Sequence, residues 1–159
     1  MPAQQCMRTT WRQLFGIRSH HSGVVQDGSN SPVRLLVVTQ NDRFYSSLVD
    51  AGSSCGWEVR RSSEISEAIE TIREHSIRLV ILDWDENGHD WRDGLGRLTS
   101  AHEGACVLLA SPVMDDNLRQ EVLRFRGYDV VPKRADREQI VRTVQFAWFW
   151  ITAKKETRH

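Results

Sequence analysis

Short apolar runs recur along the chain, separated by segments in which apolar residues have a helical spacing. Three of the runs are compact: Leu35–Val38, Leu79–Leu82 and Val107–Ala110. Apolar runs of this length without polar alternation are typical of strands that are covered on both faces. Two shorter runs, Trp57–Val59 and Tyr128–Val131, indicate further strands. The pattern therefore predicts five strands.

Helical periodicity fills the segments between these runs, because their apolar residues fall on one helix face. These residues are Phe44, Leu48 and Ala51; Ile65, Ala68, Ile69 and Ile72; Leu118, Val122 and Phe125; and Ile140, Val144, Ala147 and Ile151. Asp136, with Gln139 three residues later, predicts a capping box at the start of the last helix. Residues 91–101 predict only a short helix, since Gly94 and Gly96 each cost about 1 kcal/mol relative to Ala.

Strands that alternate with helices predict an α/β fold, a three-layer α/β/α sandwich with a five-stranded parallel sheet. Ligands of such sheets bind beyond the carboxyl ends of the strands. The polar residues that follow the strands are Thr39, Gln40, Asn41 and Asp42; Asp83, Asp85 and Glu86; Ser111; and Lys133. A carboxylate and an ammonium group are therefore expected at one edge of the sheet.

The charge of the chain is balanced, with 21 Lys and Arg residues against 21 Asp and Glu residues. The ends are weakly basic and the centre is acidic, so there is no basic stripe for nucleic acid. No apolar run approaches the roughly 20 residues of a membrane-spanning helix. We therefore expect neither nucleic acid nor membrane as a partner. The three scattered cysteines favour a reducing compartment, which predicts a cytoplasmic protein.

The N-terminal segment differs from the rest of the chain. Residues 1–31 contain Gly and Ser breaks and little hydrophobic periodicity, which indicates a flexible tail or linker. The folded domain is predicted over 32–155, and 156–159 form a basic C-terminal end. The length suits one domain.

Three segments, in this element order, resemble the receiver domains of bacterial two-component response regulators. They are Arg34–Val38, Leu79–Asp83 and Gly127–Lys133, and the resemblance extends over residues 33–152. It implies a flavodoxin-like (βα)5 receiver topology and a non-enzymatic signalling role in a phosphorelay. It also implies a histidine kinase, a phosphotransfer protein or another signalling protein as the partner.

Carried over by position, the resemblance makes Asp83 the phosphoacceptor, a carboxylate nucleophile for a phosphoryl group. Lys133 and Ser111 would contact the phosphate. The family also uses Mg²⁺, for which Asp83, Asp42 and Asp85 are the candidate ligands because this hard ion favours carboxylate oxygens.

The chain departs from the family at the residues that hold the metal and at those that transmit phosphorylation to the rest of the domain. Thr39 and Gln40 stand where receivers place two acidic residues, so the Mg²⁺ site is degenerate. Ala110 replaces the hydroxyl residue of the fourth strand, and Val130 replaces the aromatic residue of the fifth. These departures leave an alternative open, a pseudo-receiver that acts as a phosphorylation-independent interaction scaffold.

Two further alternatives follow from the residues. The segment 83–94 matches the first half of an EF-hand calcium loop, with oxygen-bearing side chains at its first, third and fifth positions and Gly88 at the sixth. The second half does not match, since Gly94 stands in place of the bidentate Glu. An enzyme of flavodoxin-like architecture is disfavoured, because no Gly-rich phosphate loop follows the first strand.

The last helix predicts an interaction surface. Its apolar stripe leaves Phe146, Phe149 and Trp150 away from the core. Aromatic residues are enriched in interface cores, and exposed apolar patches mark partner sites. We predict a homodimer or partner interface here. The alternative is that the 1–31 tail covers this face with its own apolar residues.

Overall fold

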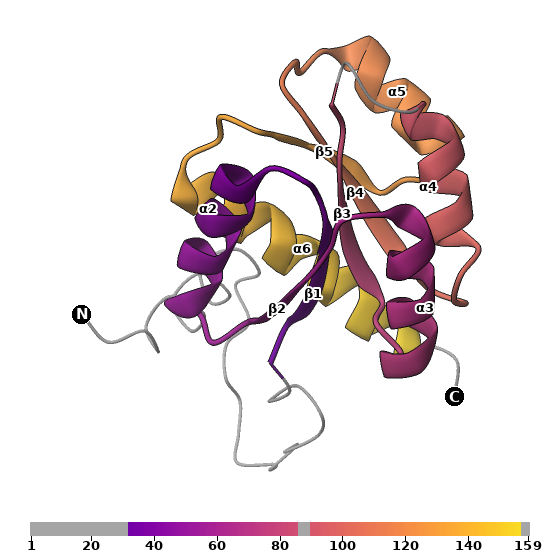
Figure 1. Cartoon of the computed structure of the whole chain (residues 1–159), viewed down its shortest axis with the longest axis horizontal. Coiled ribbons are helices and arrows are strands. Elements are labelled where there is room, and N and C mark those ends of the chain that lie inside the picture. Colours follow the sequence, from indigo (N-terminus) through magenta and orange to yellow (C-terminus); the bar gives the residue numbers. More distant parts are fainter. Residues whose placement is uncertain (1–31, 86–89, 157–159) are drawn as a thin grey trace.

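The computed structural model describes residues 32–85 and 90–156, in which strands and helices alternate (Figure 1). The strands are β1 (Arg34–Val38), β2 (Glu58–Ser62), β3 (Leu79–Asp83), β4 (Cys106–Ser111) and β5 (Asp129–Pro132). The helices are α2 (Asp42–Ser53), α3 (Ile65–His75), α4 (Trp91–Thr99), α5 (Asp116–Arg124) and α6 (Arg137–Glu156). Each predicted strand and helix is present.

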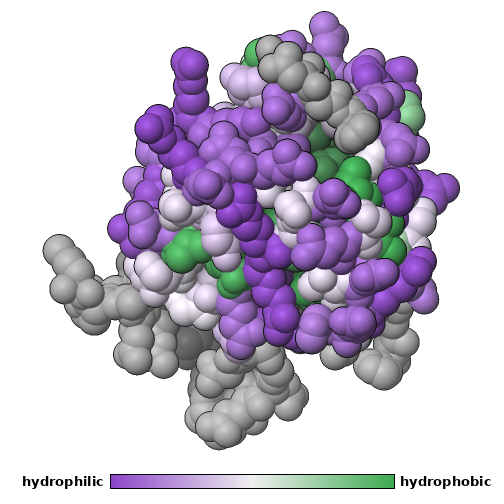
Figure 2. All heavy atoms as spheres, viewed as in Figure 1, coloured by the Kyte–Doolittle hydropathy of each residue, from purple (hydrophilic) through white to green (hydrophobic). Residues whose placement is uncertain are grey.

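All five strands are parallel and form one sheet in the order β2-β1-β3-β4-β5. The three compact apolar runs are the three central strands, which need apolar side chains on both faces. The edge strand β2 instead exposes Glu58 and Arg60. Charged side chains on an edge strand discourage pairing with another sheet. The face viewed in Figure 2 is mostly hydrophilic.

The helices form two layers. Helices α2 and α6 cover one face of the sheet, and α3, α4 and α5 cover the other (Figure 1). Alternate residues of the central strands enter the two cores: Leu35 and Val37 pack under the first layer, Leu36 and Val38 under the second. The three-layer sandwich with a flavodoxin-like (βα)5 topology is confirmed. Among the described helices, none has the length and apolar character needed to span a bilayer.

Polar side chains begin most of the helices. Asn41 accepts a hydrogen bond from the backbone N–H of Phe44 at the start of α2, and Asp115 caps α5 in the same way. At α6, the Asp136 carboxylate accepts from the backbone N–H of Gln139 at 2.8 Å, at the predicted cap. Such caps satisfy backbone donors that have no partner within the helix.

Helix α4 is short, as predicted, and one of its glycines has a packing role. A Cβ atom on Gly94 would lie 2.7 Å from Ile65 Cδ1, so the missing side chain lets α4 approach α3 closely. A Cβ on Gly96 would meet no atom within 4 Å.

Helix α5 ends before Phe125, which the periodicity had placed on its buried face. Phe125 is the C-cap, with 38% of its surface exposed. Arg126 takes a left-handed φ of 70°, and the N–H of Gly127 bonds the carbonyl of Val122 at 2.8 Å. This Schellman arrangement stops the helix, so the prediction for Phe125 was wrong.

Candidate functional site

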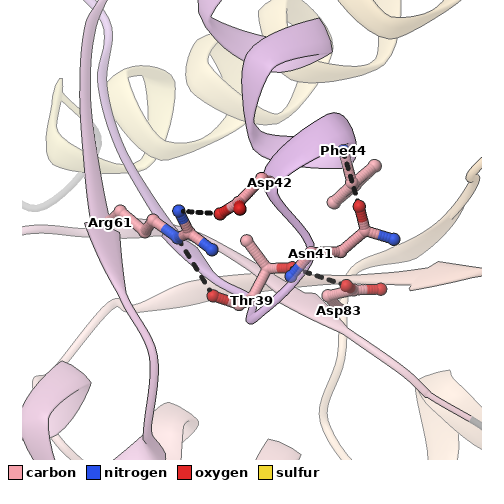
Figure 3. A network of polar contacts seen from close by, with 6 residues as sticks. All are labelled: Thr39, Asn41, Asp42, Phe44, Arg61 and Asp83. Atoms are coloured by element: carbon pink, nitrogen blue, oxygen red, sulfur yellow. Dashed lines mark hydrogen bonds and ion pairs between the residues drawn. The ribbon is translucent and has the colours of Figure 1, made fainter.

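Thr39 and Asp83 meet at the carboxyl ends of two adjacent strands. In the β1–β3 ladder Val38 pairs with Leu82, so the residues that follow each of these lie side by side. The Thr39 hydroxyl donates a hydrogen bond of 2.6 Å to Asp83 Oδ2 (Figure 3). Thr39 itself is only 3% exposed. One oxygen of the carboxylate is therefore held by β1.

Lys133 holds the other oxygen. Its Nζ lies 2.5 Å from Asp83 Oδ1, and the two side chains are 19% and 5% exposed. The backbone N–H of Lys133 donates to the carbonyl of Ser111, which fixes the chain just after β5. The structure thus brings together the carboxylate and the ammonium group that the strand ends predicted.

Ser111 is placed at the same edge, but its hydroxyl is engaged locally. The hydroxyl donates to the carbonyl of Val113 at 2.7 Å and accepts from the N–H of the same residue at 3.1 Å. In the sheet, Asp83 pairs with Ala110 rather than with Ser111. The hydroxyl proposed to contact phosphate therefore serves the turn after β4.

Asp42 points to a different partner. Its carboxylate pairs with the Arg61 guanidinium at 2.7 Å, and its side chain is 88% exposed (Figure 3). Arg61 also donates from Nε to the carbonyl of Thr39 at 3.2 Å and lies over the ring of Tyr45. Sequence reasoning missed Arg61, since nothing local indicates which of the paired arginines in β2 faces this turn.

These residues do not fit the Mg²⁺ that the family resemblance implies. The charges cancel in two pairs, Asp83 with Lys133 and Asp42 with Arg61. Mg²⁺ requires oxygen acceptors, whereas the Thr39 hydroxyl acts as a donor toward Asp83. Within 32–85 and 90–156, no three His, Cys, Asp or Glu side chains gather as a metal site. The structure therefore does not bring Asp83, Asp42 and Asp85 together as ligands.

The calcium-loop alternative falls partly outside the described residues, since 86–89 belong to that loop. Of its described positions, Asp83 is bonded to Thr39 and Lys133, and Gly94 is a buried residue of α4. The loop also follows a strand rather than a helix. These contacts give the calcium reading no support.

The predicted aromatic surface of α6 is narrower than expected. Phe146 and Phe149 are half-buried, while Trp150 is 39% exposed. The Trp150 ring packs against Tyr128 with centroids 5.4 Å apart, and Lys154 Nζ lies 3.8 Å from its centroid. The dimer interface stays a prediction, and the 1–31 tail, the alternative cover, lies outside the described residues.

No protein-family model matches the chain, and no curated protein matches it in sequence. Solved structures do match it. The chemotaxis response regulator CheY4 of Vibrio cholerae has a TM-score of 0.65 at 15% identity, over 74% of this chain and 99% of that one. NtrX from Brucella abortus has a TM-score of 0.72 at 21% identity, over 80% of this chain and 29% of that one. A CheY-like protein, TadZ, from Pseudomonas aeruginosa has a TM-score of 0.61 at 12% identity, over 74% of this chain and 94% of that one.

The chain therefore has the receiver fold of CheY-like response regulators. At these identities the likeness concerns the fold. The chemistry of this chain has to be argued from its own site.

Proposed function

We propose that the chain is a receiver-type signalling domain that works in the cytoplasm through contacts with other proteins of a two-component pathway. A histidine kinase, a phosphotransfer protein or another signalling protein would be the partner. In this proposal the domain is a pseudo-receiver, a non-enzymatic scaffold that keeps one conformation without phosphorylation.

The observation that carries this proposal is the bonding of Asp83. Both of its carboxylate oxygens are engaged by the chain itself, one by the Thr39 hydroxyl and one by the Lys133 ammonium group. Phosphoryl transfer depends on a free, aligned nucleophile and on cations that neutralise the developing charge. Here each oxygen of the nucleophile already has a partner in the chain, and the family's carboxylate cradle for the metal is replaced by Thr39 and Gln40.

The residues that would transmit phosphorylation also support a single conformation. Ala110 pairs with Asp83 across the β3–β4 ladder and has no hydroxyl to follow a phosphoryl group. Val130 is 3% exposed and packs in the core under α3, α4 and α5. A buried valine has no polar end that could move between two hydrogen-bonded positions.

A second candidate function is phosphoacceptance at Asp83. One observation favours it: Asp83 ends β3 with a lysine ammonium group 2.5 Å away, and the side chain is 5% exposed rather than fully enclosed. In this case Lys133 would release the carboxylate oxygen and pair with the transferred phosphoryl oxygens. The Thr39 hydroxyl would donate to the same group.

A phosphorylation assay separates the two candidates. The protein is incubated with a small-molecule phosphodonor and Mg²⁺, and intact mass is measured for the wild type and Asp83→Asn. The pseudo-receiver proposal predicts an unmodified wild type under conditions that phosphorylate a conventional receiver in a parallel tube. A gain of one phosphoryl group that Asp83→Asn abolishes would overturn it and establish phosphoacceptance.

A further inference from the structure

Thr39 joins the two ion pairs of the site. Its hydroxyl donates to Asp83 at 2.6 Å and accepts from the N–H of Asn41 at 2.9 Å. Its carbonyl accepts from Arg61 Nε at 3.2 Å, and its N–H donates to the carbonyl of Ser62 at 3.0 Å. Every backbone and side-chain polar atom of this buried residue thus has a partner. Figure 3 shows Thr39 between Arg61 on one side and Asp83 on the other.

The electrostatic consequence concerns these two carboxylates. The Asp83 pair and the Asp42 pair each sum to zero charge, so neither carboxylate offers an uncompensated negative charge to a cation. The affinity of oxygen sites for hard divalent cations rises with the number of ligand charges. A cation entering here would also face the Lys133 ammonium group and would have to turn the Thr39 hydroxyl away from Asp83.

We propose that Thr39 is a positioning residue that holds the Asp83 carboxylate against Lys133 and keeps the site closed to divalent cations. This inference rests on the proposed function and deepens it, since it names the residue that makes the site independent of metal. Arg61 supports the arrangement, because it holds the Thr39 carbonyl and directs Asp42 away from the site.

The test is direct binding of Mn²⁺, measured by electron paramagnetic resonance on the full-length wild type and on Thr39→Asp. Replacing the hydroxyl donor by a carboxylate gives the site a net negative charge and a second oxygen ligand beside Asp83. We expect no saturable binding by the wild type up to the highest Mn²⁺ concentration used. Thr39→Asp should bind saturably, with a dissociation constant at least about tenfold below that concentration. The matched control is Gln120→Asp, which adds the same charge at an exposed position of α5 and leaves the Thr39 hydrogen bonds intact.

The positioning role has its own readout in the carboxyl ¹³C chemical shift of Asp83. Thr39→Val removes the hydroxyl at nearly the same volume and should move this shift, whereas Thr39→Ser keeps the donor and should restore it. The far-UV circular dichroism and thermal midpoint of each variant establish that it is folded.

Four results would overturn the inference. Three concern Mn²⁺: wild-type binding as tight as that of Thr39→Asp, equal binding by Gln120→Asp, or a folded Thr39→Asp that binds no Mn²⁺. The fourth is an Asp83 shift that is unchanged in Thr39→Val. These measurements use neither a phosphodonor nor a partner protein, so their failure is distinguishable from a failure of the proposed function.

Discussion

Lys133 Nζ lies 2.5 Å from Asp83 Oδ1, although Asp83 ends β3, Lys133 follows β5, and these strands are not neighbours in the sheet. Strand β4 lies between them, and its Ala110 pairs with Asp83 on one side and with Val131 on the other. The small alanine side chain puts nothing bulky between the two charged groups. A nearly buried ion pair therefore ties β3 to β5 across a third strand.

Removing one partner of this pair should be costly. Lys133→Met leaves the Asp83 carboxylate with little access to water and without its counter-charge, and we expect a loss of about 2–4 kcal/mol in the free energy of unfolding. The double variant Asp83→Asn with Lys133→Met should recover much of this loss, because no unpaired charge then remains. Urea denaturation of the single and double variants measures both effects.

The matched control is Arg142→Met. Arg142 pairs with Glu138 at 3.6 Å on the surface of α6, where the side chains are 55% and 85% exposed. Pairs of this kind contribute about 0–1 kcal/mol. If Lys133→Met and Arg142→Met lower the free energy of unfolding by the same amount, the Asp83–Lys133 pair stabilises the fold no more than an exposed ion pair does.

Gly127 is predicted to tolerate no side chain. A Cβ atom there would lie 2.4 Å from Val122 Cγ1 and 3.0 Å from the carbonyl oxygen of Val122. Gly127→Ala should therefore destabilise the protein by about 1–3 kcal/mol through overpacking. Gly96→Ala should stabilise it by about 1 kcal/mol, because that Cβ meets open space within α4. The thermal unfolding midpoints of both variants measure these effects. A Gly127→Ala variant as stable as the wild type would contradict the packing described for the end of α5.

The fold could be predicted from the sequence because the three central strands of the sheet are the three compact apolar runs. Leu79–Leu82 is buried on both faces of the sheet, so its composition alone indicated a covered strand. The end of α5 was less predictable. Phe125 keeps the helical spacing, but the close packing of Gly127 on Val122 stops the helix before it. Spacing cannot detect a packing constraint of this kind.

The site could be predicted only in part. Asp83 and Lys133 could be predicted to lie at one edge of the sheet, because each follows or ends a strand and the carboxyl ends of parallel strands meet at the same edge. The pairing of Asp42 with Arg61 depends on the β1–β2 register, in which Val37 lies opposite Arg61. That register is a tertiary property. The same holds for the Ser111 hydroxyl, whose partner was decided by the turn after β4.

Arg92 is expected to link α4 to α5. Its guanidinium lies 2.5 Å from Glu121 Oε2, 4.6 Å from the Trp91 ring centroid and 5.9 Å from that of Phe125. The ion pair is more than a third exposed, so solvent screening limits its contribution. A double-mutant cycle with Arg92→Ala and Glu121→Gln should give a coupling of about 0.5–1 kcal/mol that weakens in high salt.

The stacking of Arg92 on the rings should survive high salt, because cation–π attraction and apolar contact are less screened than an exposed ion pair. Arg92→Ala should therefore remain more destabilising than Glu121→Gln in high salt. If the two substitutions lowered the free energy of unfolding equally in high salt, the aromatic rings would contribute nothing to the contact between α4 and α5.

Stability should fall at high pH through Cys106. Burial raises the pKa of its thiol from 9.0 to about 12, and the positive charge of Lys154 acts in the opposite direction with a lesser effect. The unfolded chain releases this proton at lower pH than the folded chain, so the contribution is complete below pH 9.0 and is lost as the pH rises toward about 12. Cys106→Ala should flatten the pH dependence of the free energy of unfolding in this window. A wild-type slope equal to that of the variant would contradict the burial of the thiol.

The pseudo-receiver proposal requires the Thr39 hydroxyl and Lys133 to keep their contacts with the Asp83 carboxylate when a phosphoryl group is offered. A crystal structure of the protein grown with Mg²⁺ and beryllofluoride, a mimic of the phosphoryl group, is the decisive measurement. We expect the Thr39 hydroxyl and Lys133 Nζ still to contact the two oxygens of Asp83, with no metal or beryllofluoride beside it. Beryllofluoride bound to an Asp83 oxygen, with Mg²⁺ next to it and Thr39 turned away, would contradict the pseudo-receiver proposal.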